Sequence, residues 1–290
     1  MSSRVNFRDL IERDKILIAM GGYDALSAKL IEKVGGEVVY MSGSSVSSST
    51  HGYPDVGLTT LTEMVTRARQ MVNAVDIPVF CDADTGYGNP INVTRTVKEF
   101  ESVGVAGIHI EDQKSPKKCG HFEKKSIIPT EEMVKKIQAA VDTRQDDNFL
   151  IIARTDARAV HGYDDAISRC KEYLNAGADV LFFEAPETKS EIKNVAEEFR
   201  YEVPLLANMT EGGKTPLLNA DELENLGYDI ILYPATGFKA AQKALKSVYL
   251  EILRTGTQRG ALDNLTTWQE RNELNGLDDI VAMEKKYAVD

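Results

Sequence analysis

The segment Glu101-Ser102-Val103-Gly104-Val105-Ala106-Gly107 joins the end of an amphipathic pattern to a short apolar run, Gly107–Glu111. The glycine is typical of the left-handed residue that ends a helix, and a buried strand follows at once. Similar phrases occur at Glu32-Lys33-Val34-Gly35-Gly36 and at Asn175-Ala176-Gly177-Ala178-Asp179. Short helix-to-strand turns repeated in this way are what a (β/α)8 barrel requires.

Eight apolar runs along the chain are predicted to be strands. They are rich in Val, Ile and Leu without strict alternation, as expected of strands covered on both faces. The predicted strands are Ile16–Met20, Glu37–Met41, Pro78–Asp82, Gly107–Glu111, Phe149–Thr155, Ala178–Glu184, Pro204–Asn208 and Asp229–Tyr233. Helical patterns between them include Asp24–Val34, Leu61–Val75, Asn92–Val103, Thr130–Thr143 and Asp164–Ala176. Eight such units favour a closed α/β TIM barrel over the alternative, a doubly wound open sheet.

The chain continues beyond the eighth unit. Residues 1–257 are predicted to form the (β/α)8 catalytic barrel. Residues 258–290 form a polar, helical C-terminal extension that contains the only tryptophan, Trp268. A tail beyond a complete barrel has little of its own to bury against, so we expect it to pack on a neighbouring subunit.

The overall composition is that of a soluble globular protein. The 290 residues are 42% hydrophobic and 27% charged, and the net charge of -11 argues against nucleic acid or an anionic membrane as partner. No apolar run approaches the roughly 20 residues that span a bilayer. The first ten residues lack the apolar core of a signal peptide, and three widely spaced cysteines fit a reducing compartment. We therefore expect a cytoplasmic enzyme with a small-molecule substrate.

Six of the predicted strands end in polar groups. In a barrel of this kind the chemistry gathers at the carboxyl ends of the strands. These endings are Tyr40-Met41-Ser42-Gly43-Ser44, Cys81-Asp82-Ala83-Asp84, Glu111-Asp112, Arg154-Thr155-Asp156, Glu184-Ala185-Pro186 and Asn208-Met209-Thr210-Glu211. Six such endings in register indicate an active site.

Asp82, Asp84 and Glu111 are the candidate metal ligands. Carboxylate oxygens without histidine or thiolate suit a hard ion, Mg²⁺ or alternatively Mn²⁺. The other interpretation is that Asp82 and Asp84 only begin the loop Thr85–Pro90. The polar ends of the other strands favour the metal site.

Cys119 lies in a polar loop beside Lys117, Lys118 and His121. Cationic neighbours lower the pKa of a thiol, so Cys119 could transfer a proton at neutral pH. Metal binding by this cysteine is disfavoured, because no second cysteine lies at ligand spacing.

The remaining cysteines and three of the histidines carry no functional signal. Cys81 sits within a strand and Cys170 on a helix, so we interpret both as small buried apolar residues. His51, His109 and His161 are likewise interpreted as structural.

Two further strand ends could bind an anion. Arg154 ends a strongly apolar strand, where it either holds a substrate carboxylate or pairs with an acid such as Asp156. Ser42, Gly43 and Ser44 offer hydroxyl and backbone N–H groups as a carboxylate cradle, although the serines at 44–49 could instead form an ordinary polar loop.

Several motifs together resemble the lyase branch of the phosphoenolpyruvate mutase/isocitrate lyase superfamily, and the similarity runs from about residue 22 to residue 277. The Lys-Lys-Cys-Gly-His motif marks that branch. The motifs are Ser42-Gly43, Asp82-Ala83-Asp84-Thr85-Gly86-Tyr87-Gly88, Glu111-Asp112-Gln113, Lys117-Lys118-Cys119-Gly120-His121, Ala153-Arg154-Thr155-Asp156 and Asn208-Met209-Thr210-Glu211-Gly212-Gly213.

The resemblance implies a barrel whose last helix is swapped between the subunits of a homotetramer. It implies Mg²⁺ near Asp82 and Asp84, with Asp55 and Glu111 close by. It also implies that the loop carrying Cys119 is a mobile gate.

The same resemblance implies a retro-Claisen cleavage and a role for each site residue. Cys119 would protonate the carbanionic carbon, Tyr40 or a metal-bound water would be the base, and Glu184 would assist. Arg154, His121 and Asn208 would stabilise the charge on the departing fragment. The implied substrate-binding residues are Ser42, Gly43, Ser44, Gly120, Arg154, Asn208 and Thr210.

Two positions guide the choice of substrate among 2-substituted malates. The strand-seven motif continues as Gly212–Pro216, the form found in the dimethylmalate branch. Trp268 aligns with an arginine that methylisocitrate lyases direct at an extra carboxylate. We therefore expect cleavage of 2,3-dimethylmalate to propionate and pyruvate. The alternatives are a 2-methylisocitrate lyase, which forms succinate and pyruvate, and an oxaloacetate acetylhydrolase.

Overall fold

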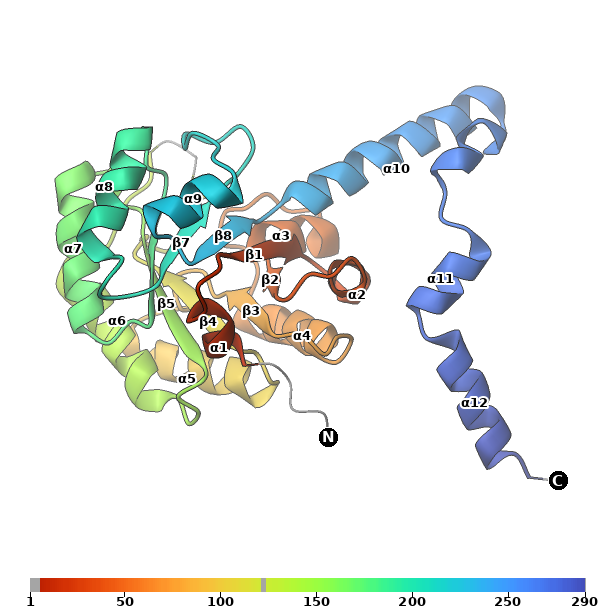
Figure 1. Cartoon of the computed structure of the whole chain (residues 1–290), viewed down its shortest axis with the longest axis horizontal. Coiled ribbons are helices and arrows are strands. Elements are labelled where there is room, and N and C mark those ends of the chain that lie inside the picture. Colours follow the sequence, from red (N-terminus) through yellow and green to blue (C-terminus); the bar gives the residue numbers. More distant parts are fainter. Residues whose placement is uncertain (1–5, 121–123, 290) are drawn as a thin grey trace. The chain divides into compact units, whose positions relative to one another are not determined.

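The computed structural model describes residues 6–120 and 124–289. Eight parallel strands follow one another around a closed barrel, and β8 pairs with β1 (Figure 1). The strands are β1 (Leu17–Gly22), β2 (Val39–Met41), β3 (Val79–Asp82), β4 (Gly107–Glu111), β5 (Leu150–Thr155), β6 (Val180–Phe183), β7 (Leu205–Asn208) and β8 (Ile230–Tyr233). The predicted (β/α)8 barrel is confirmed, and the pairing of β1 with β8 excludes the open sheet.

Helices surround the barrel (Figure 1). They are α1 (Phe7–Ile11), α2 (Ala25–Lys33), α3 (Gly43–His51), α4 (Leu61–Val72), α5 (Pro90–Ser102), α6 (Thr130–Thr143), α7 (Tyr163–Asn175), α8 (Lys189–Phe199) and α9 (Ala220–Leu226), with a 3-10 turn η1 (Ala157–Ala159). Gly35, Gly104 and Gly177 follow α2, α5 and α7 with φ of 90°, 82° and 99°, the left-handed conformation predicted for these glycines.

The serine-rich segment after β2 is a helix, so the alternative of a polar loop at residues 44–49 is wrong. Ser42 is the N-cap of α3, and its side chain accepts a hydrogen bond from the Ser45 N–H at 3.4 Å. Serine is a poor residue for a helix interior but a strong N-cap, which explains why the composition alone suggested a loop.

The short helix α1 packs against the residues that fill the barrel interior. Phe7 is 1% exposed, and its ring stacks on that of Phe80 at a centroid distance of 5.0 Å. This interior cluster consists of Phe7, Leu10, Ile11, Leu17, Ala19, Val38, Tyr40, Phe80, Leu150, Ile152, Val180, Phe182, Leu206, Ile230 and Leu232. The interior is therefore a packed core, and α1 supplies three of its apolar side chains.

The chain divides into two compact units, Met1–Gly237 and Phe238–Asp290. The second unit contains most of α10 (Thr236–Thr255), followed by the 3-10 segment η2 (Arg259–Asn264), α11 (Trp268–Leu274) and α12 (Leu277–Tyr287). Many of its large apolar side chains are exposed, including Leu253 and Trp268. The division at residue 257 and the packing of residues 258–290 on a neighbouring subunit stay predictions.

Within the described residues, every helix is too short or too polar to cross a membrane.

Replacing Phe7 by alanine is expected to lower the free energy of unfolding by about 3–5 kcal/mol, because it leaves a cavity among large buried side chains. Urea denaturation followed by circular dichroism measures this loss. Tyr201→Ala is the control, since Tyr201 is 85% exposed and should change stability by less than about 0.5 kcal/mol. A Phe7→Ala variant as stable as this control would show that α1 contributes little to the core.

Candidate active site

Polar side chains line the carboxyl end of the barrel, one layer above the apolar interior. Alternate residues of a strand point to the same face, so the residue two positions after an interior side chain also points inward. In five strands a polar residue follows an interior residue by two positions. The pairs are Tyr40 and Ser42, Phe80 and Asp82, Ile152 and Arg154, Phe182 and Glu184, and Leu206 and Asn208. The backbone thus brings five of the predicted site residues to one end of the barrel.

A cluster of carboxylates surrounds the Lys117 ammonium. Lys117 Nζ lies 2.6 Å from Asp55 Oδ1 and 3.0 Å from Asp84 Oδ1, and its side chain is buried. Asp82 belongs to the same cluster, because its Oδ1 accepts the backbone N–H of Asp84 at 2.9 Å. Three of the four predicted metal ligands therefore lie within reach of one buried cation.

The charges in this cluster are not balanced. Burial opposes ionisation of Asp82, but His109 and Lys117 outweigh it and lower its pKa to about 2. Burial, assisted by repulsion from Asp82 and Asp55, raises the pKa of Asp84 to about 6 despite Lys117. Burial also raises the pKa of Glu111 well above its usual range.

This donor set fits a divalent cation. Glu111 Oε1 is buried and has no hydrogen-bond partner among the residues that the structure describes. The same part of the chain holds no group of three acidic, histidine or cysteine side chains already arranged as a metal cage. Mg²⁺ is commonly held by one or two carboxylates while it retains several waters, so a closed cage is not required. A second positive centre would stabilise the ionised forms that burial disfavours.

Arg154 is the centre of a second cluster. Its Nε lies 2.9 Å from Asp156 Oδ2 and 3.3 Å from Glu111 Oε2, and its Nη2 lies 3.8 Å from Glu184 Oε1. Of the two interpretations of Arg154, the ion pair with Asp156 is therefore present. This ion pair does not exclude the binding of a substrate carboxylate by Arg154, because a guanidinium carries five donor N–H groups.

Asn208 and Thr210 border this second cluster. The Asn208 side-chain amide donates to Glu184 Oε2 at 3.1 Å. The Thr210 hydroxyl donates to Asn208 Oδ1 at 3.4 Å. Asn208, predicted to bind substrate, thus contacts Glu184 at the carboxyl end of β7, and Thr210, also predicted to bind substrate, contacts Asn208.

The loop that carries Cys119 lies over both clusters. The Cys119 N–H donates to the Asp55 carbonyl at 3.1 Å. A Cβ added to Gly120 would lie 2.4 Å from Arg154 Nη2 and 2.4 Å from Glu184 Oε1. Only a residue without a side chain can approach these two charged groups so closely, so the backbone at 120 lies against Arg154 and Glu184.

Two hydrogen bonds join the Gln113 side chain to the backbone of Lys118 at the start of this loop. Gln113 Nε2 donates to the Lys118 carbonyl at 2.8 Å, and the Lys118 N–H donates to Gln113 Oε1 at 3.0 Å. His121, predicted to act in catalysis, lies outside the described residues. Its role stays a prediction.

The Ser42–Ser44 segment faces the carboxylate cluster. A Cβ on Gly43 would lie 2.6 Å from Asp82 Oδ2, so this glycine lets the start of α3 approach the carboxylate. Ser42 Oγ and Ser44 Oγ are 3.2 Å apart. The N–H groups of the first turn of a helix lack intrahelical partners, which suits the predicted carboxylate cradle.

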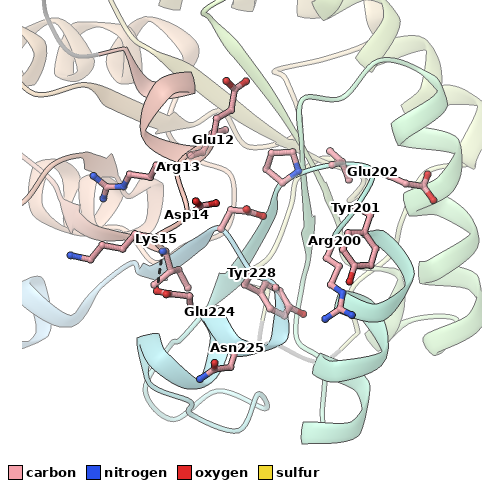
Figure 2. A pocket seen from close by; sticks show the side chains of 16 residues that line it. Glu12, Arg13, Asp14, Lys15, Arg200, Tyr201, Glu202, Glu224, Asn225 and Tyr228 are labelled. Carbon is pink, nitrogen blue, oxygen red and sulfur yellow. Dashed lines mark hydrogen bonds between the residues drawn. The ribbon is translucent and has the colours of Figure 1, made fainter.

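A cavity of about 600 Å³ opens at the opposite end of the barrel, before β1, β7 and β8 (Figure 2). The Ile16 N–H donates to Glu224 at 3.2 Å across it, and the Arg200 guanidinium stacks on the Tyr201 ring. Arg13, at its edge, pairs with Glu37 at 2.6 Å. The residues that line this cavity include none of the predicted site residues, so it is separate from the carboxyl end of the barrel.

The family described as phosphoenolpyruvate phosphomutase matches residues 7–253, which is most of the chain. The chain belongs to the phosphoenolpyruvate phosphomutase family. The resemblance drawn from the motifs is thereby confirmed.

Individual members of the phosphoenolpyruvate phosphomutase family are similar over almost their full lengths. The 2,3-dimethylmalate lyase of Eubacterium barkeri is 47% identical over 290 residues, which are 99% of each chain. The 2-methylisocitrate lyase of Aeropyrum pernix is 46% identical and covers 94% of this chain and 87% of its own. The solved structure of oxaloacetate acetylhydrolase with the inhibitor 3,3-difluorooxalacetate is 32% identical, has a TM-score of 0.92 and covers 97% of this chain and 95% of that one.

His109 was interpreted as structural from the sequence, but it lies inside the site. His109 is fully buried, and its Nε2 lies 2.9 Å from the Tyr40 hydroxyl and 3.5 Å from Asp82 Oδ1. The signal for it was the two-residue alternation: His109 precedes Glu111 by two positions and therefore shares its inward face. Burial lowers the pKa of His109 to about 4, although Asp82 opposes this.

Replacing His109 by glutamine is expected to flatten the pH dependence of stability. An unfolded histidine binds a proton near pH 6.5, but the folded one does so only near pH 4, so stability is lost as the pH falls between these values. The raised pKa of Asp84 acts in the opposite direction in this window, and in the metal-free protein His109 alone contributes a loss of about 2 kcal/mol between pH 7 and pH 5. Urea unfolding at the two pH values measures it, and an equal loss in His109→Gln would contradict the assignment.

Proposed function

We propose that this chain is a Mg²⁺-dependent carbon–carbon lyase that cleaves a 2-substituted malate, with 2,3-dimethylmalate as the preferred substrate and pyruvate and propionate as products. The observation that carries the proposal is the position of the Cys119 loop. It lies over Arg154 and Glu184 on one side and is hydrogen-bonded to Asp55, beside the carboxylate cluster, on the other.

The substrate class follows from the charges at the site. A hydroxy dicarboxylate presents two anionic ends, and Arg154 and the start of α3 can each receive one of them. The dimethylmalate lyase that is 47% identical and the methylisocitrate lyase that is 46% identical support a malate derivative.

Asp82 and Asp84 would hold the metal, with Asp55 and Glu111 close by. A bound Mg²⁺ would polarise the 2-hydroxyl and the neighbouring carboxylate and so ease loss of the hydroxyl proton. Lys117 bridges Asp55 and Asp84, so it fixes the positions of two carboxylates and neutralises part of their charge.

Residues of the second cluster would act on the departing fragment. When the hydroxyl loses its proton, the C2–C3 bond breaks, C2 becomes the keto carbon of pyruvate, and the bonding electrons move onto C3 and its carboxylate. Arg154 and Asn208 would stabilise that developing charge, and His121 would assist them. Cys119 would then donate its proton to C3 to form propionate, with Glu184 orienting Asn208.

Tyr40 stays protonated, so it can donate a hydrogen bond but is poorly suited to remove a proton. It is buried, its hydroxyl is 2.9 Å from His109 Nε2 and 3.5 Å from Asp82 Oδ2, and burial raises its pKa well above the usual value. A base must be deprotonated at neutral pH. We therefore propose that a water molecule acts as the base. The Tyr40 hydroxyl would orient the Asp82 carboxylate through its hydrogen bond.

One observation favours the alternative substrate, 2-methylisocitrate. The argument against it was the loss of an arginine at Trp268. In the second unit, however, the Arg271 guanidinium lies over the Trp268 ring, 4.1 Å from its centroid. A positive charge thus remains beside that position, and it could receive a third carboxylate.

The proposal also includes a cytoplasmic homotetramer in which the second unit packs on a neighbouring subunit. The exposed apolar side chains of that unit support packing on another subunit. The three free cysteines support a reducing compartment such as the cytoplasm.

Steady-state kinetics on three compounds tests the function. With Mg²⁺, we expect pyruvate from 2,3-dimethylmalate at a higher kcat/KM than from 2-methylisocitrate, and no oxalate from oxaloacetate. EDTA should abolish turnover and Mg²⁺ or Mn²⁺ should restore it. A preference for 2-methylisocitrate would establish the alternative lyase, and oxalate as the main product would establish the hydrolase. Absence of metal-dependent turnover on all three would refute the proposal.

Cys119→Ser is expected to lower kcat by about 100-fold or more, because the serine hydroxyl is a much weaker acid than the thiol. Pyruvate affinity and the thermal midpoint should stay unchanged, which separates this loss from misfolding. Since Cys81 and Cys170 are fully buried, Cys119 is the one cysteine accessible to reagents in the described parts of the chain. Turnover close to that of the parent would remove Cys119 from the mechanism.

A further inference from the structure

Lys125 is a buried cation that the proposed mechanism does not use. Its side chain is 1% exposed although it lies only five positions after Gly120. The backbone beside it is fixed: the Lys114 N–H donates to the Ser126 carbonyl at 2.8 Å, and Gln113 forms an antiparallel bridge with Ile127. Lys125 therefore enters the site from a segment that is anchored to the residues after β4.

The Lys125 ammonium bonds two groups that belong to different parts of the site. It donates to the carbonyl oxygen of Gly120 and, at 2.5 Å, to Asp156 Oδ1. Gly120 is the residue next to Cys119. Asp156 is the carboxylate that orients Arg154, through bonds of 2.9 Å from Nε and 3.2 Å from Nη2.

The Asp156 carboxylate is itself held from several directions. It is fully buried, and its N–H donates to Asp112 Oδ1 at 2.8 Å. Asp112 in turn accepts hydrogen bonds from Thr155 and Tyr173. A group bonded to Asp156 is thus bonded to a rigid part of the barrel.

We propose that Lys125 is a positioning residue that fixes the Cys119–Gly120 backbone relative to Arg154 by bonding both Gly120 and Asp156. The inference rests on the proposed function, in which the thiol and the guanidinium act on the same fragment. If Lys125 is neutralised, three buried carboxylates, Glu111, Asp156 and Glu184, share the single guanidinium, and the carbonyl of Gly120 loses its donor.

The chain provides a matched control at the adjacent position. Lys124 is exposed, so Lys124→Met removes the same charge without removing the buried contacts. Lys125→Met removes the buried ammonium, and Lys125→Arg keeps the charge and the donors. Amide hydrogen exchange and lyase kinetics are measured on all three variants.

For Lys125→Met we expect a kcat about 100-fold lower, the loss typical of a misplacement of about 1 Å, with KM changed much less. Exchange at the Lys118 and Cys119 amides should become at least about tenfold faster, since the local opening free energy falls. Lys125→Arg should restore most of kcat, and Lys124→Met should match the parent.

A purely structural role for Lys125 gives a different pattern. Faster exchange in residues 150–156 with normal exchange at Lys118 and Cys119 would overturn the proposal, as would normal kcat in Lys125→Met. If that variant does not fold, Lys125→Met/Asp156→Asn removes both buried charges. Fast exchange at Lys118 and Cys119 in the double variant supports the proposal, and slow exchange overturns it. Because exchange is measured without turnover, it tests Lys125 even if the lyase assignment fails.

Discussion

The ring of hydrogen bonds that closes eight parallel strands determines where the site residues lie. Once β1 pairs with β8, every strand has one face inside the barrel, and alternate residues fill that interior. The apolar layer formed by Phe80, Ile152, Phe182 and their neighbours supports the polar layer directly above it. The positions of Asp82, Arg154 and Glu184 are therefore consequences of strand register, and loop conformation affects them little.

The second constraint is charge neutrality inside a protein. Seven buried or nearly buried charged side chains meet at the carboxyl end of the barrel, and isolated charges are costly there. They are Asp82, Asp84, Glu111, Lys117, Arg154, Asp156 and Glu184. Lys117 and Arg154 each bridge several carboxylates, yet burial, assisted by repulsion from neighbouring carboxylates, still raises the pKa of Asp84 and of Glu111. A site with this imbalance attracts cations, and Lys117 and Arg154 act as its fixed counter-ions.

Much of the fold was predictable because its signals are local. A glycine that ends a helix before an apolar run requires a left-handed residue, and Gly35, Gly104 and Gly177 adopt it. The position of Asp82, Asp84 and Arg154 at one end of the barrel was also predictable, since the carboxyl ends of barrel strands must meet. The helical state of the serine segment was not, because its helix begins with the N-cap Ser42 and continues through residues of low helix propensity.

Contacts between segments distant in sequence could not be predicted from single residues. The sequence shows Lys117 as a neighbour of Cys119, but it does not show that the Lys117 ammonium lies between Asp55 and Asp84. Nothing in the chain around Lys125 signals that its ammonium reaches Asp156, 31 positions away. Such pairings depend on how a loop folds back over the barrel, which local propensity does not encode.

The helix α1 determines how a ligand can enter and leave the barrel. Because Phe7 and its neighbours pack apolar side chains into the barrel, residues 6–120 and 124–289 leave no open passage through its interior. A ligand bound at the carboxyl end must arrive and depart by the same mouth. If one molecule is split into two there, as proposed, both fragments must leave through that mouth.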